Sequence, residues 1–383
     1  KKIAPKMQKK EDLKEVAKLF LKLGIIGFGG PAAHIAMMQQ EVVVKRKWLS
    51  EQHFLDLLGA TNLIPGPNST EMAIHIGHEK AGWKGLIVAG LCFILPAVLI
   101  TGFFAFLYKE YGQLPQLQVF LYGVKPAIIA IILAAIFPLA KKSLKTGLLA
   151  IIGIGVLSLS LLQINEIALL FGAGFVGLFF YSLKKGESGA AKLNWMPLAF
   201  FPLSKTAVVA STNFNLFLIF LKIGAILYGS GYVLFAFLDA ELVAKGLLSR
   251  SALIDAIAVG QFTPGPVFSS VTFIGYQING VSGALISTLA IFLPSFVFVA
   301  LLNPLVKKLR NSKPFSVFLD AVNVASVAII VSICIQMGKD NITDWRTILI
   351  AVASIWIGFQ YKKINSALIV LGGSIAGYVL YFL

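Results

Sequence analysis

Long stretches of apolar residues alternate with short polar segments along the whole chain. A helix needs about 20 apolar residues to cross the hydrocarbon core of a bilayer. Ten stretches reach or approach that length, at residues 13–38, 84–108, 115–139, 146–162, 165–183, 213–238, 281–305, 315–337, 343–359 and 364–383. Because these runs are continuous rather than alternating, they predict about ten transmembrane helices and exclude a membrane β-barrel.

Two further stretches, 51–78 and 250–278, have a different pattern. Each contains two short helical pieces separated by Pro-Gly-Pro, at 65–67 and 264–266, and polar residues lie near the break. Neither piece is long enough to cross a bilayer. Broken backbone at membrane depth is tolerated where it is buried in protein or lines a wet cavity. The pattern therefore predicts two re-entrant hairpins.

The composition supports an α-helical protein of the inner or plasma membrane. Of the 383 residues, 57% are hydrophobic and only 13% are charged, against about 25% charged residues in soluble domains. The net charge of +16 comes from basic clusters between apolar segments. Such clusters set membrane topology and do not form a nucleic-acid surface. We therefore expect no nucleic-acid partner. Cys92 and Cys334 lie apart within apolar segments, so we expect no metal site, and no motif predicts a cofactor.

The chain contains an internal repeat. Residues 20–29 read FLKLGIIGFG and residues 220–229 read FLKIGAILYG, so six of ten residues are identical at an offset of 200. With small gaps, the two Pro-Gly-Pro motifs align, and Leu95-Pro96 aligns with Leu293-Pro294. A repeat of this length predicts two related halves. The division that follows is a basic tail (1–12), a first repeat (13–183), a linker (184–212) and a second repeat (213–383).

The charges of corresponding loops differ between the halves. Basic residues occupy 45–47 and 141–145 in the first half, whereas 307–313 is the basic loop of the second half. Opposite charge bias in corresponding loops predicts that the second copy is inverted in the membrane. The basic N-terminal tail disagrees with the orientation that these loops imply, so the absolute orientation stays open.

The breaks in the apolar segments predict an anion site. Each break starts a half-helix, whose N-terminus presents unpaired N–H groups and partial positive charge. Breaks at corresponding places in two repeats are typical of transporter binding sites. The alternative is that the glycines only allow close packing of helices. The candidate substrate-binding residues at the breaks are Gly29, Gly30, Pro31, Gly66, Asn68, Ser69, Gly229, Ser230, Gly265 and Ser269.

Two lysines occupy the same position of the two repeats. Lys22 and Lys222 each lie within an apolar segment, shortly before a break. An ionisable residue inside a span is costly and usually functional. We therefore predict that both lysines face the anion. The alternative is that their side chains extend to the nearer interface.

Three titratable residues near the first breaks are candidates for proton coupling. Glu71 and His75 are about one helical turn apart just after the first Pro-Gly-Pro, and His34 follows Pro31. Carboxylates and histidines within a membrane pathway can change charge during transport. The alternative is that Glu71 closes a capping box with Asn68 and that the histidines lie at the interface.

These motifs resemble the chromate ion transporter family in its two-domain long form. In the first half the resemblance is carried by FGGPAAHI (28–35), LIPGPNSTEMA (63–73) and AGWKG (81–85). In the second half it is carried by GQFTPGP (260–266), TFIGYQINGVSGA (272–284) and IFLPSF (291–296). The halves differ at the breaks, so we expect them to contribute unequally to the site.

The resemblance implies a secondary transporter that confers chromate resistance by efflux, as a proton antiporter driven by the proton motive force. Sulfate is a structural analogue of chromate and a second expected substrate. The expected partners are the oxyanion, protons, the lipid bilayer and a second copy of the chain in a homodimer. One alternative is a sulfate importer or a channel-like pathway. An alternative of another class, a membrane enzyme or lipid-handling protein, lacks any recognisable catalytic motif.

Overall fold

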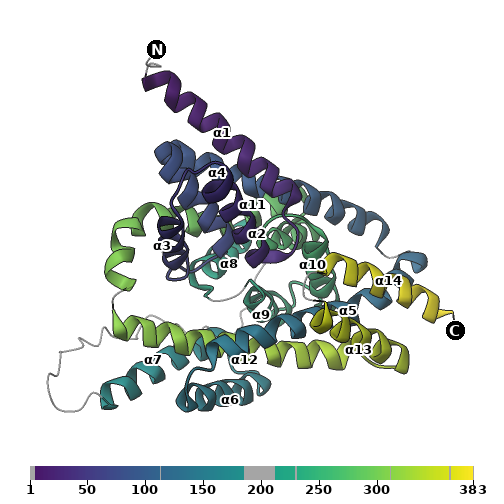
Figure 1. The fold of residues 1–383 in the computed structure, drawn as a ribbon. Helices are drawn as coiled ribbons and strands as arrows, with labels where there is room; N and C mark the ends of the chain where they lie inside the picture. The colour runs from purple at the N-terminus through teal and green to yellow at the C-terminus, as the bar shows by residue number, and fades with distance from the viewer. Residues whose placement is uncertain are drawn as a thin grey trace.

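The computed structural model describes residues 5–112, 114–184, 212–228, 231–310, 312–361 and 364–382. Helices, with short 3-10 and π-helical segments, make up the structure, and the described residues contain no strand (Figure 1). The elements of the first half are α1 (Pro5–Ile26), α2 (Gly30–Gln39), η1 (Gln40–Lys45), α3 (Glu51–Thr61), α4 (Asn68–Tyr111), α5 (Pro115–Ser143), α6 (Gly147–Leu161) and α7 (Glu166–Lys184). Those of the second half are α8 (Asn213–Ile226), α9 (Val233–Leu238), η2 (Asp239–Val243), α10 (Arg250–Phe262), η3 (Val267–Ser269), α11 (Ser270–Arg310), α12 (Lys313–Asn341), α13 (Trp345–Gln360) and α14 (Ser366–Tyr381).

The two halves place corresponding elements in the same order along the chain. The long helices α4 and α11 are both interrupted, and the interruptions have nearly the same backbone angles. Gly82 has φ 62° and ψ −152°, and Gly280 has φ 61° and ψ −148°. A glycine is needed there because residues with a Cβ rarely adopt positive φ. The glycines separate the short helix that follows each Pro-Gly-Pro from the long apolar helix after it.

The fold is that of a multi-pass membrane protein. Among the described residues, five helical segments are long and apolar enough to cross a bilayer: Asn68–Tyr111, Gln118–Ser143, Glu166–Leu183, Val267–Leu301 and Lys313–Asn341. Four shorter helices, α6, α8, α13 and α14, are also apolar. The number of about ten spans and the re-entrant course of the two hairpins remain predictions.

The two halves interlock in a reciprocal way. Helix α5 packs against α13 and α14 of the second half, and its counterpart α12 packs against α6 and α7 of the first. Tyr122 on α5 donates a hydrogen bond to Asp344, the N-cap of α13. This hydrogen bond lowers the pKa of the Asp344 carboxyl, which lies outside the membrane-spanning helices. The halves are therefore held together by contacts of corresponding helices.

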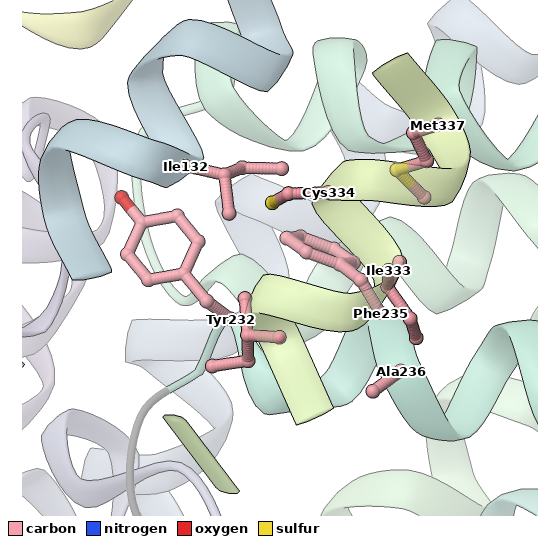
Figure 2. Close-up of a pocket in the computed structure, with 8 residues that line it drawn as sticks. Ile132, Tyr232, Phe235, Ala236, Ile333, Cys334 and Met337 are labelled. Carbon is pink, nitrogen blue, oxygen red and sulfur yellow. The ribbon is translucent and has the colours of Figure 1, made fainter. Parts of the chain in front are cut away.

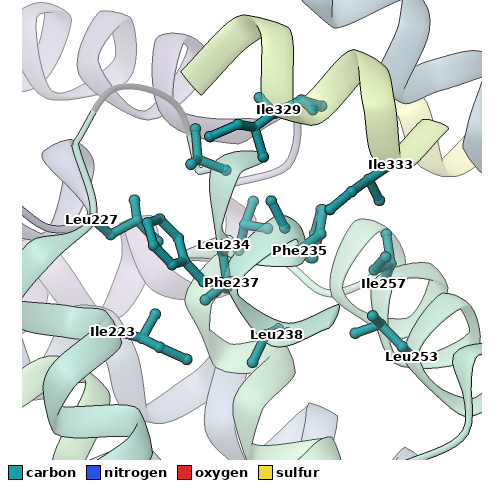
Figure 3. Close-up of a cluster of buried hydrophobic side chains, with 14 of the residues drawn as sticks. Ile223, Leu227, Leu234, Phe235, Phe237, Leu238, Leu253, Ile257, Ile329 and Ile333 are labelled. Atoms are coloured by element: carbon teal, nitrogen blue, oxygen red, sulfur yellow. The ribbon is translucent and has the colours of Figure 1, made fainter. Parts of the chain in front are cut away.

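The hydrophobic core is divided unequally between the halves. Helices α1 to α3 and the adjoining part of α4 share a small core of their own, which includes Phe20, Phe54 and Met72. In contrast, α8 to α11 belong to one large core that continues into α5 to α7 and α12. Figure 3 shows the part of this core that α8, α9, α10 and α12 form. The cause lies in the sequence of α9. All six of its residues, VLFAFL, are buried, as expected for a helix that is apolar on every face.

Candidate functional site

The two Pro-Gly-Pro turns are hydrogen-bonded across the halves in a reciprocal manner. The Gly66 N–H donates to the carbonyl of Leu227, just beyond the end of α8, at 2.8 Å. The Gly265 N–H donates to the carbonyl of Gly27, just beyond the end of α1, at 2.7 Å. Gly27 and Leu227 occupy the same position of the two repeats. The predicted breaks of one half therefore lie against the predicted breaks of the other, beside the contact between α4 and α11.

The first turn is surrounded by polar side chains. Glu71 is 0% exposed, and its Oε1 accepts a hydrogen bond from the Ser295 hydroxyl of α11 at 3.4 Å. A Cβ on Gly66 would collide with this same carboxylate oxygen. Glu71 therefore lies directly beside the turn, in contact with the opposite half.

The predicted capping box is wrong. Helix α4 begins at Asn68 with Pro67 as its N-cap and without a side-chain cap. The Asn68 amide instead donates to the Asn62 side chain at 2.9 Å, so it bridges the two helices of the hairpin. Glu71 is consequently free of a capping role, and its carboxylate is turned toward α11.

Several buried polar atoms near the first turn have no hydrogen-bond partner within the described part of the chain. They are the Glu71 Oε2, the Thr70 hydroxyl and both ring nitrogens of His75. Buried polar groups are normally paired with protein or water. Ser69, in the same helical turn, is also buried. Such a cluster is suited to hold water, protons or a polar ligand. Among the described residues, the ionisable members Glu71 and His75 have no ionisable counterpart just after the second turn, where the unpartnered buried groups are the hydroxyls of Ser269 and Ser270.

The second turn lacks the carboxylate and the serine contact that lie beside the first turn. Ala97 occupies the position that corresponds to Ser295, and a Cβ on Gly265 would lie 2.9 Å from the Ala97 Cβ. Phe273 replaces His75, and Ser270 replaces Glu71. Ser269 is buried in η3, and its hydroxyl lacks a partner among the described residues. The two turns therefore differ in their surroundings, and the unequal contribution of the halves to the anion site stays a prediction.

The start of α2 forms an open helix N-terminus next to the second turn. Gly29, with φ 103°, is the N-cap, and α2 begins at Gly30 with Pro31 in its first turn. A Cβ on Gly30 would meet nothing within 4 Å. His34, one turn later, is buried, and its Nε2 lies 2.8 Å from the Gly27 carbonyl. The same carbonyl accepts from Gly265, so His34 contacts the backbone junction between the halves.

Both predicted lysines form ion pairs. Lys22 lies 3.1 Å from Glu41, which also pairs with Lys45 and Arg46. Lys222 and Lys245 each lie 2.6 Å from Glu241. The carboxylates are buried, whereas the side chains of Lys22 and Lys222 are 49% and 45% exposed. The structure thus places each lysine between a buried carboxylate and the protein surface.

Gly229 and Ser230, the remaining predicted residues of the anion site, lie outside the described residues. An apolar pocket lies between α5, α9 and α12 (Figure 2). Its lining includes Ile132, Phe235 and Met337. Apart from Tyr232 and Cys334, its lining residues are apolar, so an oxyanion would lose its hydration there for few hydrogen-bond donors, and the pocket does not fit an oxyanion well.

Ser295 was not among the site residues predicted from the sequence. Its sequence signal is a mismatch: Leu95-Pro96 and Leu293-Pro294 align, but the next residue is alanine in the first copy and serine in the second. A polar residue gained at one of two equivalent buried positions indicates a local partner.

Comparison with known proteins agrees with this two-part architecture. The profile described as Chromate transporter matches the chain twice, at residues 14–178 and 214–378. The chain belongs to the chromate transporter family. Chromate transport protein from Cupriavidus metallidurans is 31% identical over 376 residues, which cover 96% of this chain and 93% of that protein. Probable chromate transport protein from Synechococcus elongatus is 30% identical over 374 residues, which cover 96% of this chain and 95% of that protein.

Shorter proteins also match parts of the chain. Uncharacterized transporter YwrB from Bacillus subtilis is 32% identical over 184 residues, which cover 46% of this chain and 91% of that protein. YwrB therefore has about the length of one repeat of this chain. No solved structure matches the chain.

Proposed function

We propose that this protein is a secondary active transporter that exports chromate across the cytoplasmic membrane and is driven by the proton motive force. Family membership and the printed names of the full-length relatives support chromate as the substrate. The observation that carries the proposal is the reciprocal bonding of the two Pro-Gly-Pro turns, with the buried carboxylate of Glu71 beside one of them. Sulfate, a dianion of the same shape, is proposed as a second substrate.

The proposed architecture is two inverted repeats, 13–183 and 213–383, joined by a linker at 184–212. The profile matches at 14–178 and 214–378 support these boundaries. The reciprocal contacts of α5 and α12 support a two-fold relation between the halves. The opposite charges of corresponding loops support the inversion.

The proposed anion site uses the helix N-termini at the breaks. Gly29, Gly30 and Pro31 begin α2, and Asn68 and Ser69 begin α4. Free backbone N–H groups at such positions bind oxyanions without a fixed counter-charge. The turn glycines Gly66 and Gly265, together with Gly229, Ser230 and Ser269, complete the proposed set in both halves. Glu71, His75 and His34 are the proposed proton-coupling groups, because they are the buried titratable residues nearest to the turns.

Chromate accumulation in oriented vesicles tests the direction and the energy source. We expect inverted vesicles with an imposed proton gradient to accumulate labelled chromate, and an uncoupler to abolish the accumulation. Sulfate should compete with chromate. Right-side-out vesicles without the protein provide the background. Accumulation in right-side-out vesicles would instead indicate an importer. Flux that is insensitive to the proton gradient in both orientations would indicate a channel-like pathway.

Lys22 and Lys222 are proposed to attract the anion while pairing with buried carboxylates. We expect Lys22→Ala and Lys222→Ala each to weaken chromate binding, because each change removes one positive charge near a break. Lys222→Ala should also reduce stability more than Lys22→Ala, since Glu241 then keeps only Lys245, whereas Glu41 keeps two cations. Chromate titration and thermal unfolding of the purified variants measure the two effects. Wild-type affinity in both variants, with only stability reduced, would restrict the lysines to ion pairing.

A further inference from the structure

A second buried carboxylate lies in the other hairpin. Asp255, in the middle of α10, is 2% exposed. Its Oδ2 accepts a hydrogen bond from the hydroxyl of Tyr108 on α4 at 2.7 Å. Its Oδ1 has no hydrogen-bond partner among the described residues. A buried carboxylate with one unsatisfied oxygen is costly for a fold, which points to a role beyond packing.

The repeat itself does not require this burial. Asp56 occupies the equivalent position of the first half. Its side chain is only partly buried, and it accepts a hydrogen bond from Gln52 on the same helix. The same aspartate is therefore near the surface in one copy and buried at the contact between the halves in the other.

The contacts of Asp255 are similar in kind to those of Glu71. Each hairpin has one fully buried carboxylate, Asp255 in the second half and Glu71 in the first. Each carboxylate accepts a hydrogen bond from a hydroxyl group on the long helix of the opposite half. Tyr108 of α4 contacts Asp255, and Ser295 of α11 contacts Glu71. The two carboxylates occupy positions of the repeat that do not align. Each nevertheless accepts a hydrogen bond from a hydroxyl of the opposite half.

Within the described ranges of the chain, no charged side chain forms an ion pair with Asp255. From α5, Lys125 supplies the nearest positive charge, but its ammonium donates to Ser251 at 2.6 Å. On η2, Asp239 is held by Arg250, and Glu241 is held by its two lysines. Helices α9 and α14, and α11 from Ser270 to Leu301, contain no Asp, Glu, His, Lys or Arg. The Tyr108 hydroxyl is therefore the direct polar contact of the carboxylate.

We propose that Asp255 is a second proton-carrying carboxylate of the transport cycle and that Tyr108 positions it. This inference rests on the proposed proton-driven export. In the cycle the carboxylate takes up one proton from one side of the membrane and releases the same proton to the other side. Tyr108 keeps its own proton and donates the hydrogen bond that holds the ionised carboxylate in place. Glu71 and Asp255 then carry one proton each, one in each hairpin.

The proton count per chromate tests this assignment. Purified protein in liposomes is given a pH-sensitive dye in the lumen and labelled chromate outside. We expect about two protons to move per chromate in the wild-type protein, one carried by the Glu71 carboxylate and one by the Asp255 carboxylate. Asp255→Asn should reduce the count by one, and Asp56→Asn, at the equivalent surface position, should leave it unchanged. Asp255→Glu should restore the wild-type count.

A wild-type count of one, or an unchanged count in Asp255→Asn, would overturn the proposal. If Asp255→Asn does not fold, Tyr108→Phe provides a second measurement. It removes only the hydroxyl that stabilises the ionised carboxylate, so the pH profile of transport should move toward alkaline pH. An unshifted profile would contradict the positioning role. If no protons move with chromate in the wild-type protein, the proposed proton-driven export itself is refuted. This result differs from a wild-type count of one, which refutes only the role of Asp255.

Discussion

Replacing Glu71 by glutamine is expected to abolish proton-coupled chromate transport while chromate still binds. Glutamine has nearly the shape of glutamate and can accept the hydrogen bond from Ser295, but it cannot take up or release a proton. Glu71 is completely buried beside the Gly66 turn, so the glutamine variant leaves this buried position without an ionisable carboxylate. Transport driven by a proton gradient should fall to the level of liposomes without protein, and a chromate titration should give an affinity close to wild type.

Glu110→Gln is a matched control for this prediction. Glu110 lies on the same helix but is exposed, so its loss should leave transport unchanged. Ser295→Ala removes only the hydroxyl that contacts Glu71, and we expect a partial reduction. Gradient-driven transport by Glu71→Gln at the wild-type rate would move proton coupling to His75, His34 or elsewhere. The corresponding glutamine variants of the two histidines would then identify the group.

Gly66→Ala is expected to cause the largest loss of both stability and transport among single substitutions at the turns. Gly66 has φ 135°, and a Cβ would collide with Glu71 and lie 2.7 Å from the Ser295 hydroxyl. The backbone strain costs about 1–3 kcal/mol, and overpacking adds about 1–3 kcal/mol. Thermal unfolding in detergent and the vesicle assay measure the two losses.

Two other glycines separate the causes of this effect. Gly82 also has positive φ, but nothing lies within 4 Å of its Cβ position, so Gly82→Ala tests backbone strain alone. Gly265→Ala combines strain with a contact to the apolar Ala97. It should lower stability yet leave the number of protons moved per chromate unchanged. Equal effects of Gly66→Ala and Gly82→Ala on transport would show that the contact with Glu71 has no functional importance.

The repeat and the places where helices break were predictable because both depend on local sequence. Proline and glycine interrupt helices through their own backbone preferences, whichever helices surround them. The Pro-Gly-Pro motifs therefore lie between helices in the structure, as the sequence predicts, whereas the interruption at Gly82 was not among the predicted breaks. The capping box at Asn68 failed for a related reason. Its residues have the correct spacing, but Asn62 and Ser295, which come from other helices, are the partners that Asn68 and Glu71 contact.

The sequence by itself determined that this is a helical membrane protein of two related halves, because apolar length and helix-breaking residues act over short distances. Only the tertiary structure decided which residues of the halves meet. The partners in the bonds Gly66–Leu227, Gly265–Gly27 and Tyr108–Asp255 are more than 140 residues apart. Burial was decided in the same way, since Asp56 and Asp255 are equivalent in sequence and only Asp255 is enclosed. The reason is physical: whether a carboxylate is hydrated or enclosed depends on the helices packed around it, and no local pattern encodes that packing.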